Sequence, residues 1–115
     1  MITNKYVNDF IKCLDEERFY DAHEVLEDAW YPKRFEKSAE VLLLKGFINA
    51  SVSFELMKQG KIEPSKQVWK TYLKYRQLLF KTSSKEIQAY YQIFLHIEST
   101  KKKLLYNNFK AINYK

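Results

Sequence analysis

Glycine and proline are scarce in this sequence, with only two of each among 115 residues. These residues supply most of the tight turns between β-strands, so the chain has little means of building hairpins. Residues that favour helix, such as lysine, leucine and glutamate, are abundant instead. The sequence therefore predicts an all-α protein, and we expect a single-domain antiparallel bundle of about five helices.

The size and composition favour one helical domain over residues 1–115. With 46% hydrophobic residues, the chain can bury one modest core without disulfides or metal. Cys13 is the only cysteine and cannot form an internal disulfide. Neither a signal-peptide pattern nor a long apolar run occurs, so we expect a cytoplasmic protein with no membrane partner.

Apolar spacing and helix-end signals place the helices along the chain. Pro32 should end the second helix near Tyr31, and Pro64 suits the first turn of the fourth. Ser83 and Glu86 form the pattern of a capping box ahead of the fifth helix. The other predicted bounds are residues 4–16, 35–59, 64–80 and 83–105, with a C-terminal tail at 106–115 that carries no strong helix signal.

One segment concentrates polar side chains on a predicted helix. His23, Glu27 and Trp30 share a face with the apolar Phe19 and Leu26, because residues three, four and seven apart point the same way. A polar group on such a face costs about 1 to 3 kcal/mol unless it is hydrogen-bonded, paired or bound. The segment is therefore the candidate site.

The third predicted helix carries a row of small residues that suits close packing. Ala39, Gly46, Ala50 and Ser53 recur at three-, four- and seven-residue steps, and small side chains let a second helix approach closely. We expect the helix that carries the candidate site to pack on this row.

In that arrangement Asn49 and Ser53 would lie near enough to hydrogen-bond His23 or Glu27. We expect His23, Glu27, Asn49 and Trp30 to form a hydrogen-bonded knot between the two helices, or to line a small ligand pocket there. Glu24 also belongs to this candidate polar site, or is simply solvated.

The same residues carry a resemblance to a known family. The segment Ala22–Glu27 followed by Trp30 reads Ala-His-Glu-x-Leu-Glu-x-x-Trp, and Gly46-Phe47-Ile48-Asn49 comes later in the third helix. From about residue 17 to 79 the chain resembles the prokaryotic Domain of Unknown Function 309 family. The resemblance implies a small helical bundle and no established activity.

The chain departs from the family pattern at one position that matters for a polar site. The family often has a histidine ten residues after the glycine of the third helix, where this chain has Leu56, preceded by Glu55. A polar site that depends on that histidine is therefore in doubt. Asn49 stands where the family has glutamine, and asparagine keeps the side-chain amide.

A metal site is the first alternative to a structural or binding role. His23 and Glu27 are four residues apart on a helix, a spacing that can place both side chains on one divalent metal. Glu55 and His96 are the distant candidates for further ligands. Two ligands do not make a site, the second histidine of the His-Glu-x-x-His pattern is absent, and no cofactor is predicted.

Acid–base chemistry by His23, oriented by Glu27, has no convincing nucleophile beside it. We therefore expect a non-catalytic binding or interaction module whose partner is a protein or a small ligand. A metal-binding protein or metal-dependent enzyme that uses His23 and Glu27 stays the alternative.

Charge is divided unevenly along this basic chain. Residues 1–65 hold 9 Lys/Arg and 12 Asp/Glu, whereas residues 66–115 hold 11 and 2. Lys66, Lys70 and Lys74 recur every four residues on the fourth helix. Such a surface suits nucleic acid, an acidic partner or pairing between two copies of the chain, and is also typical of a solvated face. No nucleic-acid recognition motif accompanies this surface, so nucleic-acid binding ranks third among the predicted functions.

Overall fold

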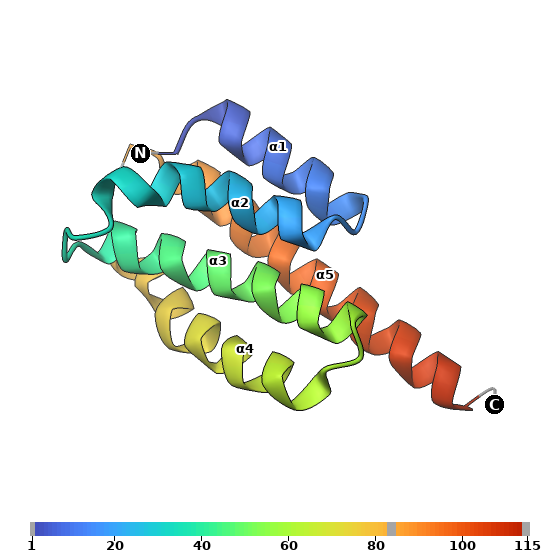
Figure 1. Cartoon of the computed structure of the whole chain (residues 1–115). Helices are drawn as coiled ribbons and strands as arrows, with labels where there is room; N and C mark the ends of the chain where they lie inside the picture. The colour runs from blue at the N-terminus through green and yellow to red at the C-terminus, as the bar shows by residue number, and fades with distance from the viewer. Residues whose placement is uncertain (1, 83–84, 114–115) are drawn as a thin grey trace.

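The structure is a computed structural model that describes residues 2–82 and 85–113 (Figure 1). These residues contain five α-helices and two short 3-10 turns. No strand occurs among those residues, so the prediction of an all-α bundle of about five helices is confirmed. None of the described helices is both long enough and apolar enough to cross a membrane. The helices are α1 (Asn4–Asp15), α2 (Phe19–Trp30), α3 (Ala39–Lys58), α4 (Ile62–Arg76) and α5 (Ile87–Asn113).

The central helix is α3, which packs between α2 and α4 and also contacts α5 (Figure 1). It is apolar around most of its circumference, as a helix with neighbours on several sides must be. Phe47 and Phe54 in α3 are fully buried. The Phe47 ring centroid lies 6.3 Å from that of Tyr72 in α4 and 6.4 Å from that of Tyr90 in α5, so one side chain joins three helices.

The small-residue row of α3 faces α4, and the prediction that it faces α2 is wrong. A Cβ atom added to Gly46 would lie 2.9 Å from the Cβ atom of Tyr75 in α4. Ser53 is buried on the same side, where its hydroxyl donates to the carbonyl of Ser65 at 2.9 Å. The Ser65 hydroxyl donates in return to the Ser53 carbonyl at 2.8 Å. The small side chains of this row therefore let α4 pack closely against α3.

Helix ends differ from the predicted ones where local hydrogen bonds decide them. Ser38 caps α3, so that helix begins at Ala39 rather than at residue 35. The fourth helix ends at Arg76 and continues as a 3-10 turn over residues 77–81. The fifth helix runs to Asn113, past the predicted end at 105, since no glycine or proline follows to stop it. The predicted cap at Ser83 lies outside the described residues.

Glu17 ends α1 in a conformation that glycine normally adopts, with φ +57°. The amides of Glu17 and Arg18 donate to the carbonyls of Leu14 and Cys13, the Schellman arrangement that favours glycine. Gly60 takes the matching position after α3, with φ +78°. The backbone at residue 17 is therefore strained in a way that the backbone at residue 60 is not.

We expect Glu17→Gly to raise the free energy of unfolding by up to about 1 kcal/mol, because glycine adopts positive φ without strain. The Lys58 amine donates to the Glu17 backbone carbonyl at 2.9 Å, and glycine keeps that carbonyl. Urea denaturation measures the change. Gly60→Ala is the comparison and should lower the free energy of unfolding by a similar amount. A lowered midpoint for Glu17→Gly would show that its side chain stabilises the fold by more than the strain costs.

Candidate functional site

His23 and Glu27 form an ion-pair contact on the outer side of α2. The Nε2 atom of His23 lies 2.7 Å from Oε2 of Glu27, and its Nδ1 atom lies 3.2 Å from the carbonyl oxygen of Tyr20. Both oxygens can only accept, so a ring with hydrogens on both nitrogens satisfies both contacts. These two contacts fix the orientation of the imidazole ring. The side chains are 21% and 44% exposed, so the pair lies at the surface and within reach of a ligand.

An acidic hollow surrounds this pair. It has a volume of about 390 Å³ and is lined entirely by α2, by Tyr20, His23, Glu24, Glu27 and Asp28. A hydrogen bond to Glu24, and the negative charge of that carboxylate, raise the pKa of Tyr20. The Tyr20 hydroxyl therefore stays protonated as a donor at the edge of the acidic hollow.

A second hollow, the α2–α3 groove, adjoins the first. It has a volume of about 270 Å³ and is mostly apolar. Tyr20 and His23 belong to both hollows and form the boundary between them. The α2–α3 groove is lined by Phe19, Tyr20 and His23 from α2 and by Val52, Glu55 and Leu56 from α3.

Two groove residues were not predicted from the sequence as site residues, and one signal marked the second of them. Val52 and Leu56 lie three and seven residues after Asn49, on the side of α3 that faces α2. Leu56 is also the position at which the family pattern often has a histidine. That departure marked a position beside His23, which the sequence alone could not show.

Three members of the predicted polar site make no hydrogen bond to the His23–Glu27 pair, so the hydrogen bonds expected of the knot are not formed. The Asn49 side-chain amide donates to the Lys45 carbonyl of its own helix at 2.8 Å. Ser53 is bonded to Ser65 of α4. The Nε1 atom of Trp30 is buried with no hydrogen-bond partner among the described residues. Only the His23–Glu27 contact remains of the expected network.

The candidate metal ligands do not assemble into a three-ligand site. Glu55 lines the α2–α3 groove with His23, but its carboxylate accepts a hydrogen bond from Gln59 at 3.1 Å. In the part of the chain that the structure describes, no group of three His, Cys, Asp or Glu side chains is placed to hold a metal ion. His23 and Glu27 thus form a contact between two side chains with no third candidate ligand placed beside them among the described residues.

The cysteine thiol is separate from both hollows. Cys13 is buried in the core on α1, and burial raises its pKa. A thiol in that state is a poor nucleophile. Cys13 therefore supplies no nucleophile to the candidate site.

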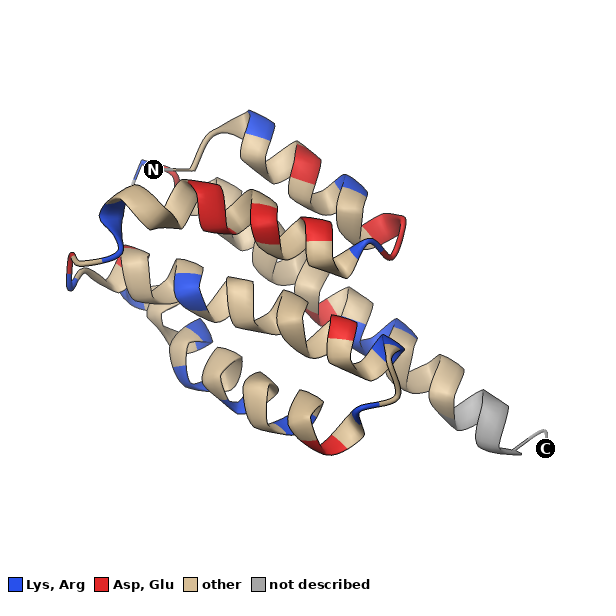
Figure 2. Cartoon of the chain, in the orientation of Figure 1, with Lys and Arg blue, Asp and Glu red and all other residues tan. Residues whose placement is uncertain are grey.

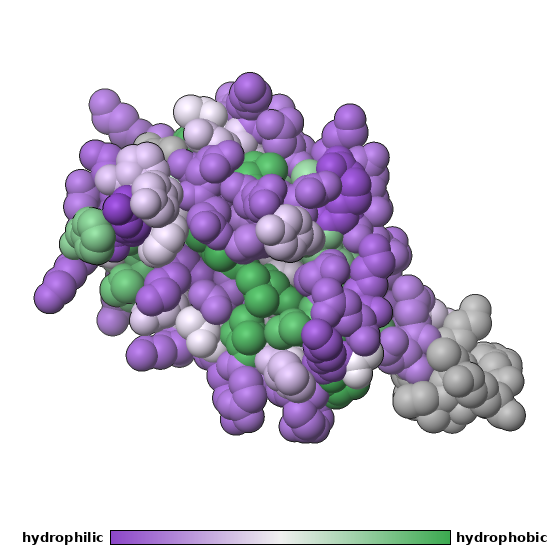
Figure 3. All heavy atoms as spheres, in the orientation of Figure 1, coloured by the Kyte–Doolittle hydropathy of each residue, from purple (hydrophilic) through white to green (hydrophobic). Residues whose placement is uncertain are grey.

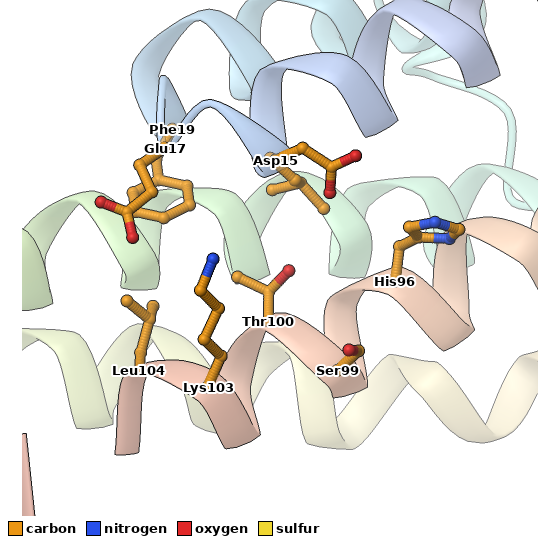
Figure 4. Close-up of a pocket in the computed structure, with 9 residues that line it drawn as sticks. Asp15, Glu17, Phe19, His96, Ser99, Thr100, Lys103 and Leu104 are labelled. Atoms are coloured by element: carbon orange, nitrogen blue, oxygen red, sulfur yellow. The ribbon is translucent and has the colours of Figure 1, made fainter. Parts of the chain in front are cut away.

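A small third hollow lies between the α1–α2 turn and α5 (Figure 4). Asp15 approaches it from the end of α1 and Glu17 from the turn, and His96 and Lys103 approach it from α5. Its volume is about 70 Å³, roughly that of two water molecules. The Nδ1 atom of His96 lies 2.9 Å from the Gln92 carbonyl of its own helix. This hollow is too small for an organic ligand, so it is not the candidate site.

The predicted basic residues lie away from both hollows. Lys66, Lys70 and Lys74 are exposed on α4, on the other side of α3 from α2. Figure 2 shows the resulting separation, with Asp and Glu along α2 and Lys and Arg along α4. The molecule thus has an acidic side and a basic side.

Comparison with known proteins identifies the family to which the chain belongs. Residues 7–68, from α1 to the first half of α4, match the family model described as a domain of unknown function (DUF309). Neither the curated proteins nor the solved structures gave a match. The matched segment includes the acidic hollow and the α2–α3 groove. Because this segment covers more than half of the sequence, the chain belongs to the DUF309 family.

Proposed function

We propose that this protein is a non-catalytic binding module that holds a basic, amphipathic helix of a partner protein along α2 and α3. One observation carries the proposal: an apolar groove and an acidic hollow adjoin each other and share Tyr20 and His23. A ligand that fits both must be apolar on one side and cationic on the other.

A helix suits this surface because two packed helices leave a groove between them that accepts the ridge of a third. Apolar side chains of the partner at helical spacing would contact Phe19, Val52 and Leu56. Its lysines or arginines would lie against Glu24, Glu27 and Asp28. Figure 3 supports the match, since apolar surface gathers over α3 and is framed by hydrophilic surface.

His23 and Glu27 have a defined part in this proposal. Their 2.7 Å contact holds the imidazole ring at the boundary of the two hollows, tilted against the neighbouring Tyr20 ring with 5.4 Å between the ring centroids. The aromatic and imidazole rings would cover the apolar side chains of the partner. Glu27 would keep one carboxylate oxygen for a partner cation.

The test is the affinity for an amphipathic helical peptide built from leucine and lysine, measured by fluorescence anisotropy. Glu24→Gln/Glu27→Gln should weaken binding about three- to tenfold, because each exposed charge pair contributes about 0.2 to 1 kcal/mol. Val52→Ser should also weaken binding, because it makes the floor of the groove polar.

The matched control is Asp9→Asn/Asp15→Asn, which removes the same charge from α1 outside both hollows. We expect it to change the affinity by less than twofold. Equal losses in the two double variants would mean that the peptide responds only to net charge. Tight binding that Val52→Ser leaves unchanged would count against the groove as the site.

A further inference from the structure

The basic side of the molecule contains lysines that the acidic surface does not neutralise. Lys66 has a partner, since its amine lies 3.4 Å from a carboxylate oxygen of Glu63. Arg76 is also paired, at 2.6 Å from Glu98. Within the described residues, no carboxylate pairs with Lys70 or Lys101. The positive charge on this side therefore remains available to a ligand.

A lysine of α5 is held close to the lysines of α4. The Lys101 amine lies 4.4 Å from the centroid of the Trp69 ring, so the side chain bridges from α5 to α4. Burial lowers the pKa of Lys101, and the nearby positive charge of Lys66 lowers it further. Two like charges brought together beside a half-buried ring repel each other, and a bound anion would relieve that repulsion.

We infer that Lys66, Lys70, Lys74 and Lys101, here called the α4–α5 lysine face, bind the phosphate backbone of a nucleic acid without regard to its sequence. The lysines of α4 recur every four residues, about 6 Å apart along the helix axis. A row of that kind follows a linear polyanion better than it encloses a single small anion. The lysines of α4 lie on the other side of α3 from α2, and none of the four lines the α2–α3 groove, so this face is separate from the groove.

The charges of this face are supplied by lysine, a residue that commonly binds phosphates as a point charge. The arginine of α4, Arg76, is already paired with Glu98. Lysine acts as a mobile point charge, which suits contacts with successive phosphates. Such contacts release counterions and give binding that weakens steeply with salt.

The experiment measures anisotropy of a fluorescently labelled, 20-nucleotide single strand of DNA of mixed sequence at several salt concentrations. Lys70→Gln/Lys101→Gln should weaken binding about tenfold at low salt. It should also make the slope of log K against log salt shallower by about 1.4, because each lost phosphate contact removes about 0.7. Circular dichroism checks that the variant keeps its helices without the contact between Lys101 and Trp69.

Lys5→Gln/Lys12→Gln is the matched control, with the same change of charge on α1. It should leave both the affinity and the slope nearly unchanged. Equal effects of the two double variants would overturn the assignment to this face. Absence of DNA binding by the unmodified protein at low salt would overturn it as well. So would binding of polyglutamate as tightly as DNA at equal charge, which would identify an acidic protein as the partner.

Discussion

Phe47→Ala is expected to destabilise the protein by about 3 to 5 kcal/mol, the usual cost of removing a buried phenylalanine ring. The side chain is fully buried, and its ring lies between Tyr72 of α4 and Tyr90 of α5. Its loss leaves a cavity where three helices meet. Because small domains are stable by about 5 to 15 kcal/mol, this loss is a large part of the whole.

Urea denaturation followed by circular dichroism measures that change. Phe35→Ala removes the same atoms from a side chain that is 84% exposed, and it should change the free energy of unfolding by less than about 0.5 kcal/mol. Similar midpoints for the two variants would contradict the placement of Phe47 at the centre of the bundle.

Gly46→Val is expected to destabilise the protein by about 1 to 3 kcal/mol through overpacking. A Cβ atom at this position would meet the Cβ atom of Tyr75, which cannot move unless the α4 backbone moves with it. Valine adds two further methyl groups to the same contact. Glycine costs about 1 kcal/mol in a helix interior, so a stable contact with α4 explains why it is tolerated here.

The control is Lys45→Val, which places the same residue at the neighbouring, exposed position of α3. We expect Lys45→Val to be nearly neutral in urea denaturation. If Gly46→Val is as stable as Lys45→Val, then α4 does not approach α3 at Gly46.

Much of the fold follows from the sequence, because helix identity depends on local signals. Pro32 ends α2, and the apolar spacing predicts all five helices. The partner of the small-residue row could not be predicted. Since α3 is apolar around most of its surface, the sequence does not show whether Gly46 and Ser53 face α2 or α4.

The same ambiguity explains which part of the candidate site was predicted. His23 and Glu27 interact within one helix, so their four-residue spacing was enough to predict the contact. The part played by Ser53 depended on how α3 is rotated about its axis, and that rotation turns Gly46 and Ser53 toward α4 and leaves Val52 and Leu56 on the side of α2. Asn49 shares the face of Val52 and Leu56, but its amide donates to the Lys45 carbonyl of its own helix.

Methyl NMR spectra of Val52 and Leu56 during titration with the leucine–lysine peptide show whether the α2–α3 groove is the binding site. Ile62, exposed on α4, serves as a reporter away from the groove. If the peptide occupies the groove, the largest chemical-shift changes occur at Val52 and Leu56, with little change at Ile62. Changes centred on Ile62, or no changes at the two groove residues at saturating peptide, would contradict binding in the groove.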